Sequence, residues 1–321
     1  MGVPGFFLWL IKKYKNKKIV FPKAKAEKDD LIHNIDYLLI DMNCMIHPEC
    51  FKTLDLMKIT DIDKIEAYYT HYYLPYRGSS VWGKYQSMVE NSQNKLDEKR
   101  VNLIAKYKKD INPKTTVLDI GCGKPSFLAK CHDKFQSNCI GIDFSDKGWT
   151  DNSTYIDKLN LSVTDVNNLE LEKLPDIITM WHYLEHDYSP KETLKKLKSM
   201  IAPKGLVFIE VPNFESDSRK KFGANWAGYH TPRHTFLFSP KTITQLLKDT
   251  GFSIVDLNIN GTLDPYNLYW MSMMEKKNID WSKNMEGEFW GYVRGMLLFR
   301  VKQFFNRNKS FGVMTIIAQA D

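Results

Sequence analysis

Cysteine is scarce in this sequence and never occurs in close pairs. The 321 residues contain five cysteines, and none of them stands in a C-x-x-C spacing. A disulfide framework needs an even set and a structural zinc site needs close pairs of ligands, so the pattern disfavours both and leaves Cys44 and Cys50 as ordinary thiols. Such cysteine usage is typical of a reducing compartment, and we expect a cytoplasmic protein.

Long apolar runs are missing as well. The N-terminal run Phe6–Ile11 is far shorter than the roughly 20 residues that cross a bilayer, and no basic region precedes it. The aromatic stretch 281–305 is interrupted by Arg294, Arg300 and Lys302, which argues against a membrane span there. We therefore expect no transmembrane segment.

An excess of one charge is absent from most of the chain. The formal net charge is +7, but residues 1–28 alone hold eight lysines and one acidic residue, and the remaining 37 basic and 37 acidic residues cancel. A nucleic-acid-binding protein usually has a basic face. The balanced body disfavours that class, although the stretch Lys12–Lys28 leaves phosphate contacts open as an alternative to a solvated surface.

The most informative stretch runs from Thr115 to Gly123 and reads TTVLDIGCG. Its apolar run predicts a buried strand that ends near Asp119 and enters a tight turn. Gly121 and Gly123 permit backbone conformations that a side chain would block and let a ligand approach closely, and Pro125 suits the first turn of a following helix. The turn is therefore expected to present backbone N–H groups to a polar or anionic ligand.

A second β-like run, Asn138–Asp143, also ends in an acid, a little over twenty residues after Asp119. In nucleotide-binding α/β units an acid at this distance accepts hydrogen bonds from the ribose hydroxyls. Each such bond contributes about 1.5–3 kcal/mol, so Asp143 is predicted to contribute to nucleotide affinity.

These motifs resemble those of the class I S-adenosylmethionine-dependent methyltransferases. LDIGCG at 118–123 looks like the first motif of that family and GID at 141–143 like its second-strand acid, and Thr164-Asp165, DIITMW at 176–181 and PKG at 203–205 match later elements in order. The resemblance implies an α/β fold with a Rossmann-like seven-stranded sheet, helices on both faces and an antiparallel last strand. One departure is Lys124-Pro125, which replaces the usual third glycine.

The resemblance also implies S-adenosylmethionine as the cofactor and assigns its contacts. Asp119 and the two glycines would hold the methionine part, Asp143 the ribose, and Asp165 the adenine amino group. The full set of predicted cofactor residues is Asp119, Gly121, Cys122, Gly123, Asp143, Phe144 and Asp165.

The first 66 residues resemble a different family. MGVPGFFLWL at the start and IDYLLIDMNCMIHP at 35–48 look like the N-terminal motifs of XRN-type 5′-to-3′ exoribonucleases. Asp41 is the only match to that family's metal-binding carboxylates, and a two-metal site needs several acids. We predict an exonuclease-like fragment that is not catalytic and binds no metal, joined to a methyltransferase as a fusion protein or by misassembly of the reading frame.

The run His182–His186, HYLEH, follows the fourth predicted strand. It matches the zinc-protease pattern H-x-x-E-H, but it stands where the resembled family has a Leu-Glu-His sequence facing the active site. We predict that His182 and His186 are catalytic residues contacting cofactor or substrate, that Glu185 starts a helix, and that no metal is bound. A divalent metal assisting O-methylation stays a minor alternative.

The stretch 225–240, NWAGYHTPRHTFLFSP, is dense in histidine, arginine and aromatic residues. It resembles a Pro-Arg-His loop found after the fifth strand in a broad group of these enzymes, some near glycan or quinone pathways. His230 and His234 are predicted to remove a proton from the methyl acceptor, and Tyr229 and Arg233 to bind it. Simple packing of this loop on the core is the alternative.

The predicted organisation has two parts. Residues 1–66 form the exonuclease-like fragment. Residues 67–321 form the methyltransferase domain, with a lid and helix at 67–112, a core at 113–259, an insertion at 260–310 and a last strand at 311–321. Within it, Ser239-Pro240 predicts the start of a helix that ends at Gly251. The amphipathic stretch 281–305 is predicted to cover the active site or, alternatively, to lie on a membrane surface.

The predicted function is in-line methyl transfer from S-adenosylmethionine to a small-molecule, glycan or lipid-like acceptor, which is the one partner that the sequence implies. Two alternatives stay open. One is an RNA-directed methyltransferase or nuclease-related nucleic-acid-binding protein that uses the basic N-terminus. The other is a non-catalytic scaffold whose altered glycine loop has lost its cofactor.

Overall fold

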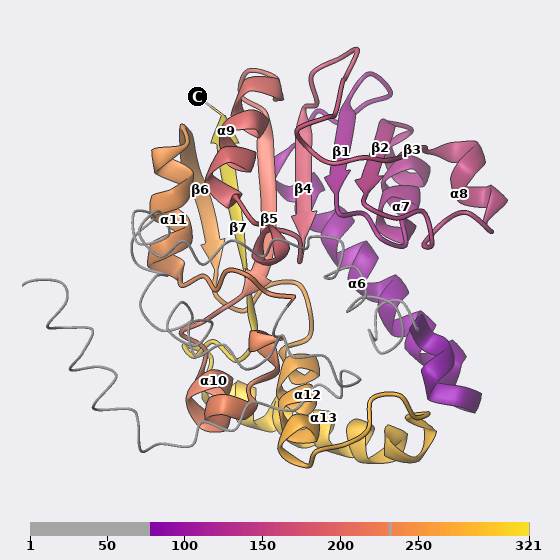
Figure 1. The fold of residues 1–321 in the computed structure, drawn as a ribbon, viewed down its shortest axis with the longest axis vertical. Helices are drawn as coiled ribbons and strands as arrows, with labels where there is room; N and C mark the ends of the chain where they lie inside the picture. Colours follow the sequence, from indigo (N-terminus) through magenta and orange to yellow (C-terminus); the bar gives the residue numbers. More distant parts are fainter. Residues whose placement is uncertain (1–77, 231–232, 321) are drawn as a thin grey trace, which may run out of the picture.

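A seven-stranded sheet forms the centre of the protein in the computed structural model, which describes residues 78–230 and 233–320 (Figure 1). The strand order is β3-β2-β1-β4-β5-β7-β6; β7 runs antiparallel to both of its neighbours, and every other pair is parallel. This confirms the predicted Rossmann-like fold with an antiparallel last strand. The strands are β1 (Thr116–Ile120), β2 (Asn138–Asp143), β3 (Asn160–Val163), β4 (Ile177–Trp181), β5 (Leu206–Pro212), β6 (Phe252–Asn258) and β7 (Val313–Ala320).

The central strands are buried on both faces. Every residue of β1, β4 and β5 is buried, which explains why these runs are apolar throughout instead of alternating. In the register, Asp119 of β1 pairs with Gly141 of β2 on one side and with Thr179 of β4 on the other. The carboxyl ends of β1, β2 and β4 therefore come out at the same edge of the sheet.

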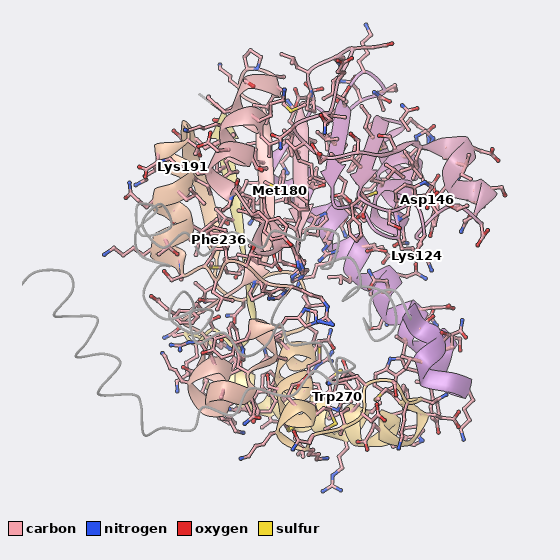
Figure 2. The ribbon with its side chains drawn as sticks, in the orientation of Figure 1. Lys124, Asp146, Met180, Lys191, Phe236 and Trp270 are labelled. Carbon is pink, nitrogen blue, oxygen red and sulfur yellow. The ribbon has the colours of Figure 1, made fainter. Side chains whose placement is uncertain are left out.

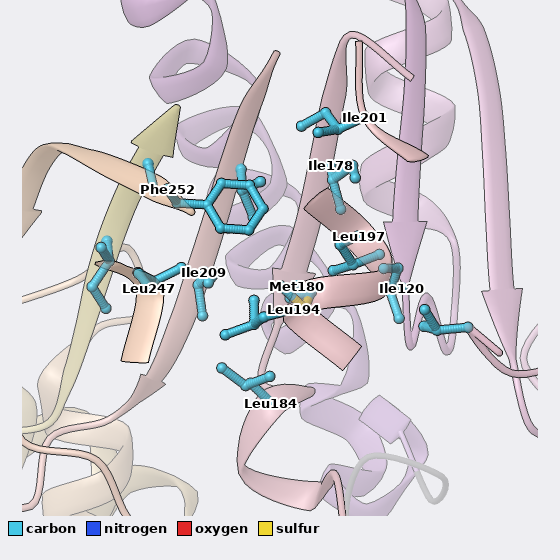
Figure 3. Packing of buried hydrophobic residues seen from close by; sticks show 14 of the residues in the cluster. Ile120, Ile178, Met180, Leu184, Leu194, Leu197, Ile201, Ile209, Leu247 and Phe252 are labelled. Atoms are coloured by element: carbon cyan, nitrogen blue, oxygen red, sulfur yellow. The ribbon is translucent and has the colours of Figure 1, made fainter. Parts of the chain in front are cut away.

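Helices cover both faces. One face packs against α9 and α11, with Leu194, Leu197, Ile243 and Leu247 fully buried (Figure 3). The other face packs against α6 and α7 through residues such as Ile104. The longer helices are α6 (Gln86–Tyr107), α7 (Ser126–Phe135), α9 (Pro190–Met200), α11 (Pro240–Asp249), α12 (Pro265–Lys276) and α13 (Phe289–Phe305). The shorter ones are η3 (Gly78–Tyr85), α8 (Ser153–Lys158), η4 (Leu184–His186), α10 (Asp217–Phe222), η5 (Gly223–Asn225), η6 (Ala227–Tyr229) and η7 (Glu286–Glu288).

The helix ends follow the local chemistry of the sequence. At α11 the Ser239 side chain accepts a hydrogen bond from the Thr242 N–H at 3.1 Å, and Thr242 Oγ1 accepts one from the Ser239 N–H at 2.8 Å, a reciprocal cap. This confirms the predicted start of the helix. Pro125 stands one residue earlier than expected, because it occupies the N-cap position of α7 rather than lying within its first turn.

A third layer lies beyond the carboxyl ends of the central strands (Figure 1). It consists of α10, α12 and α13, which share an aromatic core with Trp226, Trp270 and Phe311. The stretch expected as one amphipathic segment at 281–305 is divided, since η7 precedes α13. Among the described residues no helix is long and apolar enough to cross a membrane.

The exonuclease-like N-terminal segment, including Asp41 and Lys12–Lys28, lies outside the described residues. The first residues of the predicted lid, 67–77, lie outside them too. The domain boundaries given above therefore stay predictions.

Candidate active site at the carboxyl edge of the sheet

The turn after β1 adopts the left-handed backbone conformation that its glycines predict. Gly121 and Gly123 have φ angles of +71° and +48°, in the region that only glycine enters easily. A Cβ on Gly121 would lie 2.7 Å from the ring of Tyr183, whereas a Cβ on Gly123 would meet nothing within 4 Å. The turn is thus closely packed on its β4 side and open at Gly123.

Asp143 faces this turn from the end of β2. Its Oδ2 accepts a hydrogen bond from the Gly123 N–H at 2.9 Å, and its Oδ1 accepts a longer one from the Ser145 N–H at 3.3 Å. Burial raises the pKa of Asp143, and these backbone bonds partly offset the shift. A carboxylate has about four acceptor positions, so Asp143 keeps capacity for a hydroxyl donor. The next residue, Phe144, is 50% exposed and extends an aromatic ring beyond the strand end.

The other predicted cofactor residues lie less directly at the turn. Asp119 is buried within the sheet, where it accepts a hydrogen bond from Thr179 Oγ1 at 2.5 Å, and burial raises its pKa to about 7. Cys122 is buried behind the turn. Asp165 is exposed after β3, where its carboxylate accepts hydrogen bonds from the Asn167 and Asn168 N–H groups at 2.7 and 3.0 Å and so stabilises its own turn.

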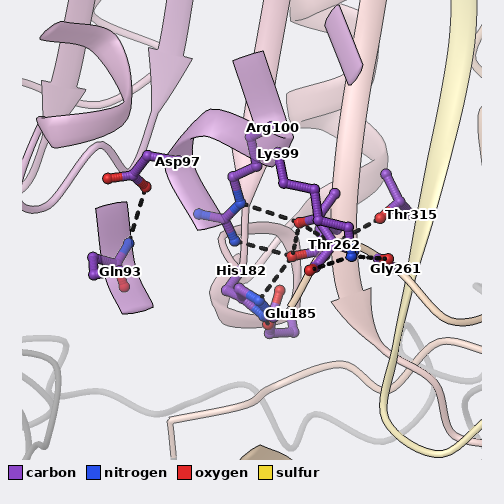
Figure 4. Close-up of polar contacts among 10 residues, drawn as sticks. Gln93, Asp97, Lys99, Arg100, His182, Glu185, Gly261, Thr262 and Thr315 are labelled. Carbon is purple, nitrogen blue, oxygen red and sulfur yellow. Dashed lines mark hydrogen bonds and ion pairs between the residues drawn. The ribbon is translucent and has the colours of Figure 1, made fainter. Parts of the chain in front are cut away.

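His182 follows β4 and is held between two carboxylates (Figure 4). Its Nδ1 is hydrogen-bonded to Glu185 Oε1 at 3.3 Å, and its Nε2 forms an ion pair with Glu210 Oε1 at 3.3 Å. Burial alone would lower the pKa of His182, but the two carboxylates outweigh it and raise the pKa to about 9. His182 is therefore an imidazolium at neutral pH. Its φ of +59° turns the chain sharply out of the strand.

Glu210 is the centre of this polar network. It is fully buried in β5, and its carboxylate accepts hydrogen bonds from Arg100 Nη2 at 2.9 Å and Thr315 Oγ1 at 2.7 Å, besides two from Thr262. Burial would raise the pKa of Glu210, but His182, Arg100 and Thr315 hold it well below its usual range. Because these partners come from distant parts of the chain, no local motif in the sequence could have indicated the network.

The loop after η6 attaches to η4 by backbone hydrogen bonds. The Thr235 and Phe236 N–H groups donate to the Glu185 carbonyl at 2.8 and 3.2 Å, and Thr235 Oγ1 donates to the Asp187 carbonyl at 2.9 Å. This attachment brings His234 to His186, with ring centroids 4.6 Å apart. Figure 2 shows Phe236 of this loop at the level of the carboxyl ends of the central strands.

The remaining predicted residues lie around the same loop. The rings of His230 and His234 are 4.9 Å apart, and Tyr229 packs edge-on against Trp226 at 5.2 Å. Arg233 is half-buried, and its carbonyl accepts a hydrogen bond from His186 Nδ1 at 3.0 Å. Burial holds the pKa of His230 and of His234 well below its usual range, so both imidazoles are neutral at pH 7.

The H-x-x-E-H pattern does not have its protease geometry here. Residues 184–186 form a single 3₁₀ turn, and His182 lies before it in a left-handed conformation, so the two histidines do not share a helical face. Glu185, expected to start a helix, lies in this turn and is fully buried.

Comparisons with known proteins agree with this geometry. The pattern of the methyltransferase domain matches residues 88–257, and that of the XRN 5′-3′ exonuclease N-terminus matches residues 1–71. Ubiquinone biosynthesis O-methyltransferases of Rickettsia akari and Rickettsia typhi are 24% and 25% identical over 165 and 197 residues, or 48% and 54% of this chain. The chain spans 65% and 79% of the length of these two relatives. A structure assigned as a sarcosine dimethylglycine methyltransferase from Galdieria sulphuraria has a TM-score of 0.50 and 12% identity, over 72% of this chain and 87% of that one.

The fold and the glycine turn define the class, an α/β protein with a nucleotide-type site at the carboxyl edge of its sheet. The chain belongs to the methyltransferase domain family, and it is a class I S-adenosylmethionine-dependent methyltransferase.

The residues at the β1–α7 turn fit S-adenosylmethionine. The open side of Gly123 leaves room next to the loop, the Asp143 carboxylate retains acceptor capacity for ribose hydroxyls, and the Phe144 ring offers an apolar surface to a base. Pro125 occupies the N-cap position of α7, so Lys124-Pro125 connects this turn directly to the helix.

Proposed function

We propose that the protein transfers a methyl group to a hydroxyl oxygen of a small-molecule acceptor with an apolar part. The observation that carries the proposal is the group of neutral imidazoles at the carboxyl end of β4, next to the glycine turn. A hydroxyl must lose its proton as it is methylated, and neutral imidazole accepts a proton at physiological pH.

The chain's own residues divide the work as follows. Asp143 and the turn at Gly121 and Gly123 hold the nucleoside and methionine parts of the cofactor. When bound, S-adenosylmethionine supplies an electrophilic methyl group on a sulfonium sulfur. The protein contributes mainly alignment of acceptor oxygen, methyl carbon and sulfur, since proximity can account for much of the barrier reduction.

The histidines take different roles in the proposal. His182 is protonated between Glu185 and Glu210, so it positions η4 and cannot accept a proton. His230 is half-buried and is the proposed proton acceptor; its lowered pKa keeps the ring unprotonated at pH 7 and makes it a weaker base than free imidazole. Arg233, in the same loop, supplies hydrogen-bond donors for an oxygen of the acceptor, and Tyr229 an aromatic wall.

An apolar part of the acceptor is supported by two observations. The Rickettsia relatives are named for ubiquinone biosynthesis. In addition, α13 exposes six large apolar side chains, and every charged residue of this helix is basic. These exposed residues are Trp290, Leu297, Leu298, Val301, Phe304 and Phe305.

The test is methyl transfer from S-adenosylmethionine labelled in the methyl group. Dodecyl 3,4-dihydroxybenzoate, the free acid and dodecylamine serve as acceptors. We expect an O-methyl product, formed faster from the ester than from the acid, and none from the amine. His230→Ala should lower kcat by about 100-fold or more, whereas the distant His132→Ala should leave it unchanged. Methylation of the amine in preference to both hydroxyl acceptors would contradict the proposal.

A further inference from the structure

Three metal-ligating side chains meet beyond the end of β4. Glu185 and His186 come from η4, and His234 comes from the loop after η6. One donor atom of each lies within 4.8 Å of the donor atoms of the other two. It is the one such group of three or more among residues 78–230 and 233–320.

Both imidazoles are oriented as metal ligands usually are. His186 Nδ1 donates a hydrogen bond to the Arg233 carbonyl at 3.0 Å, and His234 Nδ1 donates one to the Gly228 carbonyl at 2.8 Å. A carbonyl on Nδ1 fixes the tautomer in which Nε2 carries the lone pair. Histidines that bind metals typically have their second nitrogen held in this way.

Glu185 supplies the negative charge. Its side chain is fully buried, and its Oε1 is hydrogen-bonded to His182 at 3.3 Å. Its Oε2 has no hydrogen-bond partner within the described part of the chain. A buried carboxylate oxygen without a partner is costly, and a cation between Glu185 and the two imidazoles would satisfy it.

The backbone holds the cluster together before any ion binds. The Glu185 carbonyl accepts hydrogen bonds from the Thr235 and Phe236 N–H groups, directly after His234. Donors around a tetrahedral ion at about 2.1 Å stand about 3.4 Å apart. Donor atoms within 4.8 Å therefore need shifts of about 1 Å, which side-chain rotation provides.

We propose that Glu185, His186 and His234 form a site for a divalent first-row transition cation such as Zn²⁺ or Mn²⁺. Two imidazoles and one carboxylate suit these ions, whereas Mg²⁺ and Ca²⁺ prefer oxygen ligands. Three protein donors leave at least one position for a further ligand. The site lies close to the glycine turn, since Tyr183 packs on Gly121 and precedes Glu185 by two residues.

The experiment uses the full chain, stripped of metal with a chelator and titrated with Co²⁺ as a spectroscopic substitute for Zn²⁺. Bound equivalents and the visible absorption of Co²⁺ are measured for the wild type, His234→Gln and Glu185→Gln. We expect each variant to bind one equivalent less than the wild type and to lose the corresponding absorption. Comparison with the wild type removes any contribution from thiols and histidines elsewhere in the chain.

His132→Ala is the matched control, because His132 Nδ1 is also hydrogen-bonded to a backbone carbonyl, that of Ser137 at 3.2 Å, but has no place in the cluster. It should bind Co²⁺ like the wild type. Where a variant is unstable, the rise in Tm of the wild type with Zn²⁺, and its absence with equimolar Mg²⁺, provides a second measurement. Equal Co²⁺ stoichiometry in folded wild type and His234→Gln, or a wild-type Tm that Zn²⁺ does not raise, would overturn the proposal. Neither readout requires a methyl donor, so this test is separate from that of the proposed function.

Discussion

Removing the charge of Glu210 should strongly destabilise the protein. Glu210 is fully buried and its carboxylate is paired with Arg100 at 2.9 Å and His182 at 3.3 Å. In Glu210→Gln the buried Arg100 and the half-buried His182 both remain, with one carboxylate fewer to pair with. Breaking a buried ion pair on one side typically costs about 3–5 kcal/mol, a large part of the 5–15 kcal/mol that holds a domain together.

Urea unfolding, followed by circular dichroism, measures this cost. With a slope of roughly 2–3 kcal/mol per M of urea, the midpoint should fall by about 1–2.5 M. The double variant Arg100→Met/Glu210→Gln should lose about 1–3 kcal/mol less than the sum of the single variants, because it leaves fewer unpaired charges. A loss below about 1 kcal/mol in Glu210→Gln, or strict additivity in the cycle, would refute the idea that this carboxylate holds the network together.

The network also predicts a pH dependence. The pKa of His182 is raised to about 9 from its ordinary 6.5, so its stabilising contribution is full below pH 6.5 and is lost as the pH rises through 9. The pKa of Glu210 is lowered, so its contribution is present above its ordinary pKa of 4.5 and is lost as the pH falls below it. In Glu210→Gln the free energy of unfolding should decline less between pH 6.5 and 9 than in the wild type. NMR titration of the His182 ring in this variant should report a lower pKa than in the wild type.

Three further predictions concern Asp119, the glycine turn and α13. Burial raises the pKa of Asp119 from 3.8 to about 7, so the folded state binds more protons and stability should fall as the pH rises between these values; Asp119→Asn should remove up to about 4 kcal/mol of that decline in urea titrations. Gly121→Ala should cost about 1–3 kcal/mol in unfolding free energy, because φ is +71° and the new Cβ meets Tyr183, whereas Gly287→Ala, whose Cβ meets nothing, should change little. In a sedimentation assay the wild-type protein should pellet with vesicles rich in anionic lipid, and Leu298→Asp should pellet less. Equal pelleting of the two proteins would count against the alternative that α13 lies on a membrane surface.

The sequence was a good guide to the sheet because its signals are local. Apolar runs ending in Asp119 and Asp143 marked two strands, and the resemblance to the methyltransferase family, carried by these and the later motifs, implied the topology that the structure shows. Ser239-Pro240 predicted the start of α11, because a helix cap depends only on neighbouring residues. The division of 281–305 into η7 and α13 was missed, since that break depends on packing against η3, where the Met285 N–H donates to the Val81 carbonyl at 2.8 Å.

The site was predictable only in part, for the same reason. The glycine turn and Asp143 could be read from two short motifs. The partners of His182 could not, because Glu210 lies inside an apolar strand and Arg100 on a distant helix, and only the fold brings them together. The meeting of Glu185 and His186 with His234 was likewise hidden, because His234 belongs to a loop that approaches η4 through backbone hydrogen bonds.

The most direct test of the central claim is isothermal titration of S-adenosylhomocysteine into the full chain, with Asp143→Ala and Asp146→Ala examined in parallel. Asp146 is an exposed acid a few residues beyond Asp143 and serves as the matched control (Figure 2). We predict binding by the wild type and Asp146→Ala, and at least about tenfold weaker binding by a folded Asp143→Ala, from the loss of one or two charge-assisted hydrogen bonds. Failure of the folded wild type to bind, or equal affinity in Asp143→Ala, would contradict a cofactor site at this turn.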